Sequence, residues 1–106
     1  MDDKIEFIEL TKIKIEKFNV RKHDIDKGIT KLAENIKALG LIEPITVYKK
    51  SDDGKYVILV GQRRFWAHQF LNYNYPNEKF GKEEQLPNVI KCRIIPEPET
   101  DEEKNG

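Results

Sequence analysis

Three arginines are the first candidates for chemistry, because the chain otherwise carries its positive charge on lysine. Fifteen of its nineteen basic residues are lysine. Arg63 and Arg64 follow Gly61 at the end of a hydrophobic run, and Arg21 follows Asn19 in a short polar segment. The planar guanidinium of arginine binds phosphate and carboxylate through two parallel hydrogen bonds, whereas lysine offers a point charge. These arginines therefore indicate an anion-binding site.

The residues after Gly61 also predict the start of a helix. The apolar run 56–60 is typical of a buried strand, and residues 62–71 are predicted to form a helix. A helix start leaves backbone N–H groups that can donate to a phosphate, and adjacent guanidinium groups add charge. The helix dipole otherwise disfavours cations in a first turn, so two arginines there are unusual. The alternative interpretation is that both arginines are solvated or paired with carboxylates.

A second candidate segment, residues 40–44, has the sequence Gly-Leu-Ile-Glu-Pro. By itself it is a glycine-capped helix end followed by a proline that stops the helix. His23 and His68 have no partner at a metal-ligand spacing and are expected at the surface or the edge of the core. Cys92 lies in a predicted strand, where a buried, unreactive thiol is expected. The sequence contains no Walker loop and no G-x-S-x-G elbow, so it predicts no catalytic residue and no metal ligand.

Hydrophobic periodicity predicts the elements that must position these segments. Strands are predicted over 5–15, 45–49, 56–60 and 88–95. Helices are predicted over 26–39 and 62–71, with Asp26 as the N-cap of the first helix and Gly40 at its C-terminal end. The sequence Ser-Asp-Asp-Gly at 51–54 predicts a hairpin turn between two of the strands.

Residues 72–86 are polar and aromatic, and we expect them to form a long loop. Its aromatic residues Tyr73, Tyr75 and Phe80 could stack on nucleic-acid bases or anchor the loop to the core. With this loop in place, the order of elements predicts a small α+β domain that has a mixed sheet of about four strands and two main helices.

Length and composition describe one small, neutral domain. The 106 residues are 38% hydrophobic, and nineteen basic residues balance nineteen acidic ones, which excludes a uniformly basic coat for nucleic acid. No apolar run is long enough to span a bilayer, and the acidic N-terminus does not resemble a signal peptide. A single cysteine cannot form an internal disulfide. These features predict a cytoplasmic protein without a membrane partner.

The neutral total conceals an acidic C-terminal segment. Residues 96–106 contain two prolines and no apolar residue and carry a net charge of −4, which leaves residues 1–95 at +4. Such a composition is typical of a chain without stable structure. We therefore expect an ordered domain over 1–95, followed over 96–106 by a disordered tail or the start of a linker.

Taken in order, these segments resemble the N-terminal domain of the ParB family of chromosome and plasmid partitioning proteins, which share a fold with sulfiredoxin. Residues 56–67, YVILVGQRRFWA, are similar to the family's strand and G-E-R-R-x-x-A box, the most specific of its motifs. Residues 29–44, ITKLAENIKALGLIEP, are similar to the family helix that runs into a G-x-x-Q-P segment. Residues 5–21 resemble the opening strand and turn, so the resemblance covers about residues 5–95.

The resemblance implies a site for CTP with Mg²⁺. By motif match, the cytidine and phosphate side would be formed by Gly61, Gln62, Arg63, Arg64 and Ala67. The residues that cradle the phosphates and close the pocket would be Gly40, Leu41, Ile42, Glu43 and Arg21. In the family, nucleotide binding lets two such domains close into a clamp that slides on DNA. The resemblance thus implies a self-associating module that acts with other partition proteins and reaches DNA through another domain or an adaptor.

The chain departs from the family pattern at two site positions. Gln62 replaces the usual glutamate of the arginine box, and Glu43 replaces the usual glutamine. A carboxylate beside a triphosphate is unfavourable unless a metal ion or an arginine lies between them. The family's E-N-x-Q-R phosphate motif and its helix-turn-helix do not occur in this sequence. Hydrolysis of CTP and sequence-specific DNA binding are therefore not expected of this chain alone.

Two alternatives keep the same fold. One is a small nucleotide-dependent enzyme, either a DNA nuclease or a small-molecule kinase. The other is a domain that bridges DNA-bound adaptors through its surface and has a vestigial pocket. Sulfiredoxin itself resembles the chain less well in its chemistry, because its catalytic cysteine lies in a G-C-H-R motif at the position of Gln62, and Cys92 is too distant to replace it. We therefore expect a binding module rather than a stand-alone enzyme.

Overall fold

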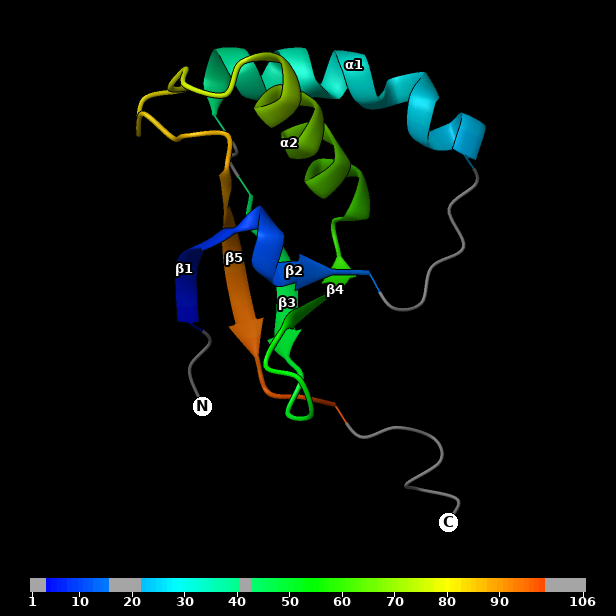
Figure 1. Ribbon diagram of the computed structural model, residues 1–106. Helices are drawn as coiled ribbons and strands as arrows, with labels where there is room; N and C mark the ends of the chain where they lie inside the picture. The colour runs from blue at the N-terminus through cyan, green and yellow to red at the C-terminus, as the bar shows by residue number, and fades with distance from the viewer. Residues whose placement is uncertain (1–3, 16–21, 41–42, 99–106) are drawn as a thin grey trace.

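The computed structural model describes residues 4–15, 22–40 and 43–98. In chain order, the described strands and helices are β1 (Lys4–Glu9), β2 (Ile13–Lys14), α1 (Lys22–Leu39), β3 (Ile45–Lys49), β4 (Tyr56–Val60), α2 (Gln62–Asn74) and β5 (Val89–Ile95) (Figure 1). Neither of these helices combines the length and the apolar character that a membrane span requires. The short polar segment that contains Asn19 and Arg21 falls outside the described residues.

The five strands form one mixed sheet in the order β1-β5-β3-β4-β2. Strand β5 pairs antiparallel with β1 and parallel with β3, and β4 pairs antiparallel with β3 and parallel with β2. The predicted α+β class is confirmed, with five strands in place of about four. Strand β4 lies inside the sheet, as an apolar run of five residues indicates.

The extra strand comes from the N-terminal segment. The expectation of a single strand over 5–15 is wrong, because this segment forms two strands. Strand β1 ends at Glu9, a 3-10 turn covers Leu10–Lys12, and β2 then pairs with β4 on the far side of the sheet. Leu10 and Ile13 are both buried, at a spacing of three that suits a 3-10 turn. The Leu10 N–H donates to the carbonyl of Asn88 at 2.9 Å, which ties this turn to the segment before β5. Apolar alternation alone does not reveal such a change of direction.

Helix α1 begins at Lys22, four residues before the predicted start, so the expectation that Asp26 is the N-cap is wrong. Residues 22–25 contain no proline or glycine that would stop a helix, and Ile25 lies one helical turn before Ile29. Helix α2 likewise extends beyond the predicted end at residue 71, as far as Asn74. It ends there because Tyr75 precedes Pro76, and a residue before proline disfavours helical backbone angles.

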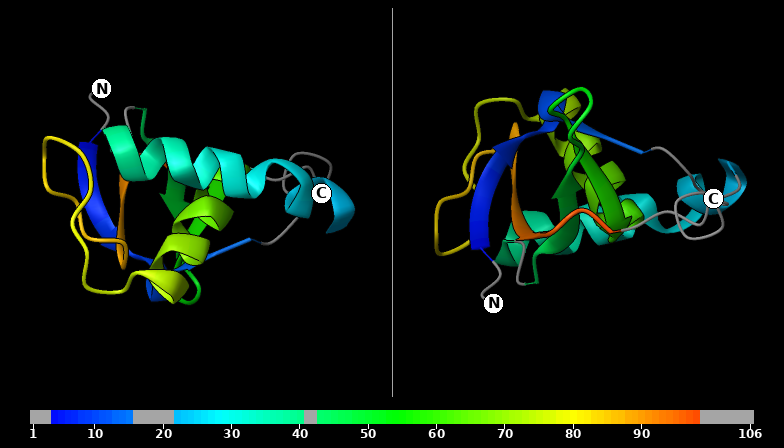
Figure 2. Two further views of the ribbon diagram at one scale, coloured as in Figure 1. Left: turned by 90° about the horizontal axis from the view of Figure 1, so that it is seen from above. Right: turned by 90° about the horizontal axis from the view of Figure 1, so that it is seen from below.

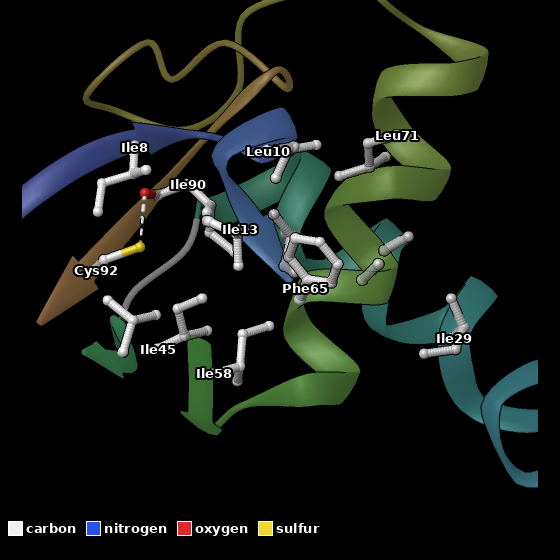
Figure 3. Close-up of a cluster of buried hydrophobic side chains, with 14 of the residues drawn as sticks. Ile8, Leu10, Ile13, Ile29, Ile45, Ile58, Phe65, Leu71, Ile90 and Cys92 are labelled. Atoms are coloured by element: carbon white, nitrogen blue, oxygen red, sulfur yellow. Dashed lines mark hydrogen bonds between the residues drawn. The ribbon is translucent and has the colours of Figure 1, made fainter. Parts of the chain in front are cut away.

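Both helices lie on the same side of the sheet, as the two views of Figure 2 show. Helix α2 contacts α1 as well as β3 and β5, so it fills the space between the longer helix and the sheet. Phe65 of α2 points into the core, where it is 3% exposed among isoleucine side chains from the sheet and the side chain of Leu10 from the 3-10 turn (Figure 3). Packing of Phe65 therefore fixes the start of α2, and with it the backbone of the two preceding arginines, Arg63 and Arg64.

The hairpin turn and the long loop follow the sequence closely. Gly54 adopts a positive φ of 73°, and the turn is closed by a hydrogen bond from the Gly54 N–H to the Lys50 carbonyl at 2.8 Å. The loop between α2 and β5 is anchored by Phe80, which is 1% exposed. Tyr73 lies in the last turn of α2 and not in the loop, and it is 87% exposed. Anchoring is thus confirmed for Phe80, while the ring of Tyr73 stays accessible.

Candidate functional site

The two motif segments identified in the sequence meet at the start of α2. Gly61 precedes the helix with a φ of 106°, which L side chains rarely adopt. A Cβ at this position would lie 2.6 Å from Cγ2 of Ile45, the first residue of β3. Glycine is therefore required on two grounds, and it allows the first turn of α2 to sit directly against the start of β3.

Arg64 joins the segments by hydrogen bonds. Its Nη1 donates to the backbone carbonyl of Glu43 at 3.1 Å and to that of Pro44 at 2.9 Å, twenty or more residues earlier in the chain. Arginine can span two carbonyls in this way because its planar guanidinium presents several donors in a fixed geometry. The segment between α1 and β3 is consequently pinned to α2 by Arg64, which is half-buried.

A shallow groove opens beside this junction, with a volume of about 190 Å³. Helix α1 and the segment after it meet Arg64 around the groove, which is lined by Leu32, Asn35, Ile36, Leu39, Gly40, Glu43 and Arg64. Its surface is mainly apolar, and the charged groups of Glu43 and Arg64 lie among these lining residues. Such a combination of an apolar wall with a few charged groups suits a ligand that has both a flat apolar part and an anionic part.

The N-terminus of α2 adds positive potential beside Arg64. No side chain among the described residues caps this helix, and its first turn contains no acidic residue. The unpaired N–H groups of a helix start and the helix dipole both favour an anion. Gln62 is the first residue of the helix and is half-buried, whereas the side chain of Arg63 is exposed and lies over Gly28 of α1. The first turn of α2 therefore carries both arginines, and the guanidinium of Arg64 lies at the groove while that of Arg63 lies over α1.

Other predicted site residues have supporting positions. Gly40 has a φ of 81° and is buried, and its N–H already donates to the Ile36 carbonyl at 2.6 Å. Gly40 therefore shapes the groove and does not offer its N–H to a phosphate. Ala67 is fully buried in the core, so its methyl group contributes packing. The remaining predicted residues, Arg21, Leu41 and Ile42, lie outside the described residues.

Four groove residues of α1 were not anticipated from the sequence, namely Leu32, Asn35, Ile36 and Leu39. The helical periodicity assigns Leu32, Ile36 and Leu39 to the apolar face, which is normally core. Leu39 is nevertheless 63% exposed, because the chain turns away from α1 immediately after it at Gly40. The sequence does contain one indication of this exposure, which is Gly40. This glycine marks the end of the helix, where the apolar face of α1 is no longer covered by the core.

Cys92 and His68 are both buried away from the groove. The thiol of Cys92 donates to the Ile90 carbonyl at 3.3 Å (Figure 3), and burial, with a smaller effect of Glu6, raises its pKa to about 12. The expected burial of the thiol is therefore confirmed, and the raised pKa disfavours the thiolate, which is the nucleophilic form. His68 is fully buried on α2, so the expected position at the surface or core edge is wrong. The side chain of His23 lies outside the described residues.

Comparison with solved structures supports the predicted fold. The chain is similar to sulfiredoxin from Arabidopsis thaliana, with a TM-score of 0.64 and 26% identity, covering 89% of this chain and 86% of that chain. It is also similar to the C-terminally truncated chromosome-partitioning protein ParB from Caulobacter crescentus complexed with CTP-gamma-S. Here the TM-score is 0.59 with 18% identity, covering 92% of this chain and 46% of that chain.

Comparison of sequences relates the chain to chromosome-partitioning and nucleoid occlusion proteins. The chain is 38% identical over 64 residues to the probable chromosome-partitioning protein ParB of Campylobacter jejuni, covering 60% of this chain and 22% of that protein. It is 35% identical over 66 residues to a nucleoid occlusion protein of Bacillus velezensis, covering 62% and 20%. The chain thus spans about a fifth of the length of these relatives. The family model described as the ParB N-terminal domain matches residues 1–75, so the chain belongs to the ParB N-terminal domain family.

Proposed function

We propose that this chain is the nucleotide-binding module of a ParB-type DNA partition protein. It binds CTP with Mg²⁺ in the groove between α1 and α2, and the bound nucleotide promotes self-association and spreading on DNA. DNA and other partition proteins are engaged through further domains or through an adaptor. The role assigned to this chain is binding and switching, without turnover of the nucleotide by the chain alone.

The observation that carries this proposal is the bridge made by Arg64. Its hydrogen bonds to the Glu43 and Pro44 carbonyls bring the glycine-to-proline segment after α1 against the arginine box of α2. These are the two segments that the family resemblance assigns to nucleotide binding. The groove they border also lies beside the N-terminus of α2, where anions are favoured.

The groove residues suit the parts of a nucleotide. Leu32 and Leu39 offer an apolar surface for a base, and Arg64, which lines the groove, offers charge to phosphates. The exposed guanidinium of Arg63 is not among the lining residues and would add its charge from over Gly28 of α1. The exposed carboxylate of Glu43 would repel a triphosphate, but it becomes favourable as a ligand for the Mg²⁺ that the nucleotide carries. The Caulobacter crescentus relative, crystallised with CTP-gamma-S, supports a cytidine nucleotide as the ligand to try first.

Titration calorimetry with CTP, ATP and GTP in the presence of Mg²⁺ tests this proposal. We expect binding that is selective for CTP. Arg63→Ala is the sharper variant, because Arg64→Ala would also release the segment that Arg64 holds. We expect Arg63→Ala to weaken CTP binding about tenfold, in line with the loss of one charge-assisted hydrogen bond.

The matched control is Arg93→Ala, which removes an exposed arginine from β5, outside the groove. It lowers the net charge of the chain by the same amount but should leave CTP affinity nearly unchanged. Equal losses of CTP affinity in the two variants would show that Arg63→Ala acts through the net charge of the chain and not through a contact with the nucleotide. Absence of binding to all three nucleotides would reject the proposal for this chain.

A further inference from the structure

Gly28 is an unexpected residue in the interior of α1. It is flanked on both sides by helix, which extends from Lys22 to Leu39. A glycine inside a helix destabilises it relative to alanine, because glycine loses more backbone freedom on folding. Its φ is not among the positive values found in the described chain, which belong to Glu84 and four other glycines. Backbone conformation therefore does not explain why glycine occupies this position.

The guanidinium of Arg63 explains it. A Cβ built on Gly28 would overlap Nη2 of Arg63 and would lie 3.4 Å from Cζ and 4.0 Å from Nη1. These guanidinium atoms are the three nearest heavy atoms to that Cβ, so Arg63 occupies the space that any other side chain would need. Gly28 thus forms a seat on α1 for the end of an arginine that starts on α2.

The seat lies in line with the groove. Gly28 precedes Leu32 by four residues, so both face the same side of α1, and Leu32 lines the groove. Arg64 is fixed by the carbonyls of Glu43 and Pro44, which follow the C-terminal end of α1. The two guanidinium groups of the arginine box therefore have different surroundings: that of Arg64 is hydrogen-bonded to carbonyls, and that of Arg63 lies in the space that the missing side chain of Gly28 leaves on α1.

We propose that Gly28 is a positioning residue for anion binding, because its lack of a side chain lets the guanidinium of Arg63 lie against α1, on the helix face that also carries the groove residue Leu32. This inference rests on the proposed function, in which Arg63 contacts the phosphates of the nucleotide. An arginine side chain loses considerable rotamer freedom when it is immobilised on a ligand. Seating it in advance reduces that loss, which strengthens binding without adding a contact.

The variant Gly28→Ala separates this role from a purely structural one. Alanine favours helix, so the melting temperature should not fall, whereas the affinity for CTP with Mg²⁺ should weaken about tenfold as Arg63 is displaced. Thr30→Ala is the control for helix propensity, since it also introduces alanine into α1 but at an exposed position. The control should retain the affinity of the wild type.

A double-mutant cycle with Arg63→Ala tests whether Gly28 acts through that arginine. In the Arg63→Ala background, Gly28→Ala should cause no further loss of affinity and should raise the melting temperature by about 4 °C, because the added methyl group then meets no guanidinium. Additive losses of affinity would overturn the coupling.

The outcomes also distinguish this inference from the proposed function. If wild type and Gly28→Ala bind CTP equally while Arg63→Ala binds weakly, the site stands and the role of Gly28 is rejected. If the wild type does not bind CTP, the titration is repeated with inorganic triphosphate as the anion. Tenfold weaker triphosphate binding by Gly28→Ala would retain the inference without the nucleotide, and no binding by the wild type would overturn both.

Discussion

The two adjacent arginines of α2 have different environments, although the sequence presents them as a pair. Arg64 is half-buried and its Nη1 is engaged by two backbone carbonyls, whereas Arg63 is exposed and crosses to α1. Successive residues on a helix point about 100° apart, so one guanidinium reaches toward β3 and the other toward Gly28. The sequence therefore presents the two arginines as a pair and could not assign a separate position to each.

A second residue on α2, His68, makes the stability of the domain depend on pH. It is fully buried, and neither ring nitrogen has a well-aligned hydrogen-bond partner among the described residues. Burial lowers its pKa from 6.5 to about 4, and this effect outweighs the nearby backbone carbonyls of Pro87 and Val89, which favour the charged ring. The folded protein thus holds His68 neutral under conditions in which the unfolded chain is protonated.

We predict that acid lowers the free energy of unfolding of the wild type more than that of His68→Gln. As the pH falls from 7 to 5, the unfolded chain takes up a proton at His68 that the folded chain does not, so the free energy of unfolding should fall by about 2 kcal/mol. The window ends near pH 4, where the folded state also becomes protonated. Urea denaturation at the two pH values measures this difference.

Comparing the slope of stability against pH removes the constant packing cost of the substitution. Asp53 and Glu83 do not interfere at pH 5, because hydrogen bonds with lysine side chains lower their pKa from ordinary values of 3.8 and 4.5. Their stabilising effect is present above those values and is lost only in stronger acid. An equal slope in wild type and His68→Gln would show that His68 is not the titrating group.

At the level of elements, the loop between α2 and β5 is docked on the end of α1 by two glycines. Gly40 and Gly81 both have positive φ, and a Cβ on Gly81 would lie 2.6 Å from Cα of Gly40 and 2.8 Å from the Leu39 carbonyl oxygen. Lys37 reinforces the contact through an ion pair with Glu78 at 3.0 Å. Since Gly40 and Leu39 line the groove, this loop supports one end of it.

We predict that Gly81→Ala is far more damaging than Gly54→Ala. Both glycines have nearly the same φ, 72° and 73°, so both substitutions introduce similar backbone strain of about 1 kcal/mol. A Cβ on Gly54 meets nothing within 4 Å, whereas one on Gly81 meets backbone atoms that cannot rotate away. The free energy of unfolding, measured by urea denaturation, should fall by about 2 kcal/mol more for Gly81→Ala. Equal losses would mean that the close approach of the two glycines is not maintained in solution.

The elements were predictable to the extent that local patterns determine them. Helix α2 and strands β3, β4 and β5 followed from apolar runs and turn residues, because each of these signals acts within a few positions. The separation of β1 from β2 was not predictable, since it depends on pairing with β5 and β4, which are distant in sequence. The contact of Arg63 with Gly28 was also not predictable from the sequence, because residues 28 and 63 are far apart along the chain.

For the whole molecule, the fold alone leaves the chemistry open. The same arrangement of sheet and helices is similar to both sulfiredoxin and ParB structures, and the sulfiredoxin match has the higher TM-score, 0.64 against 0.59. The family assignment comes from sequence, and the candidate site comes from residues carried by α1 and α2. The groups at the start of α2, which are Gln62 and two arginines, favour anion binding over thiol chemistry.

Charge distribution is the remaining property of the whole chain, because its neutral total is the sum of opposite parts. Residues 96–106 carry −4 and residues 1–95 carry +4. The negative charges of the acidic segment offset the attraction of the domain for polyanions, and this effect is strongest at low salt, because salt screens charges that are more than a Debye length apart, about 10 Å at 0.1 M. We predict that neutralising the segment with Glu99→Gln, Asp101→Asn, Glu102→Gln and Glu103→Gln strengthens binding to a short DNA duplex about tenfold at low salt.

These four substitutions preserve side-chain size, so they change charge and little else. Fluorescence anisotropy of a labelled duplex, measured across a salt titration, gives the affinities of both proteins. The gain should disappear at high salt, because long-range attraction is screened while short-range contacts persist. A gain that survives high salt would point instead to a direct contact made by the new amide side chains. No gain at low salt would show that the positive charge of residues 1–95 is too dispersed to attract DNA, whatever the charge of the acidic segment.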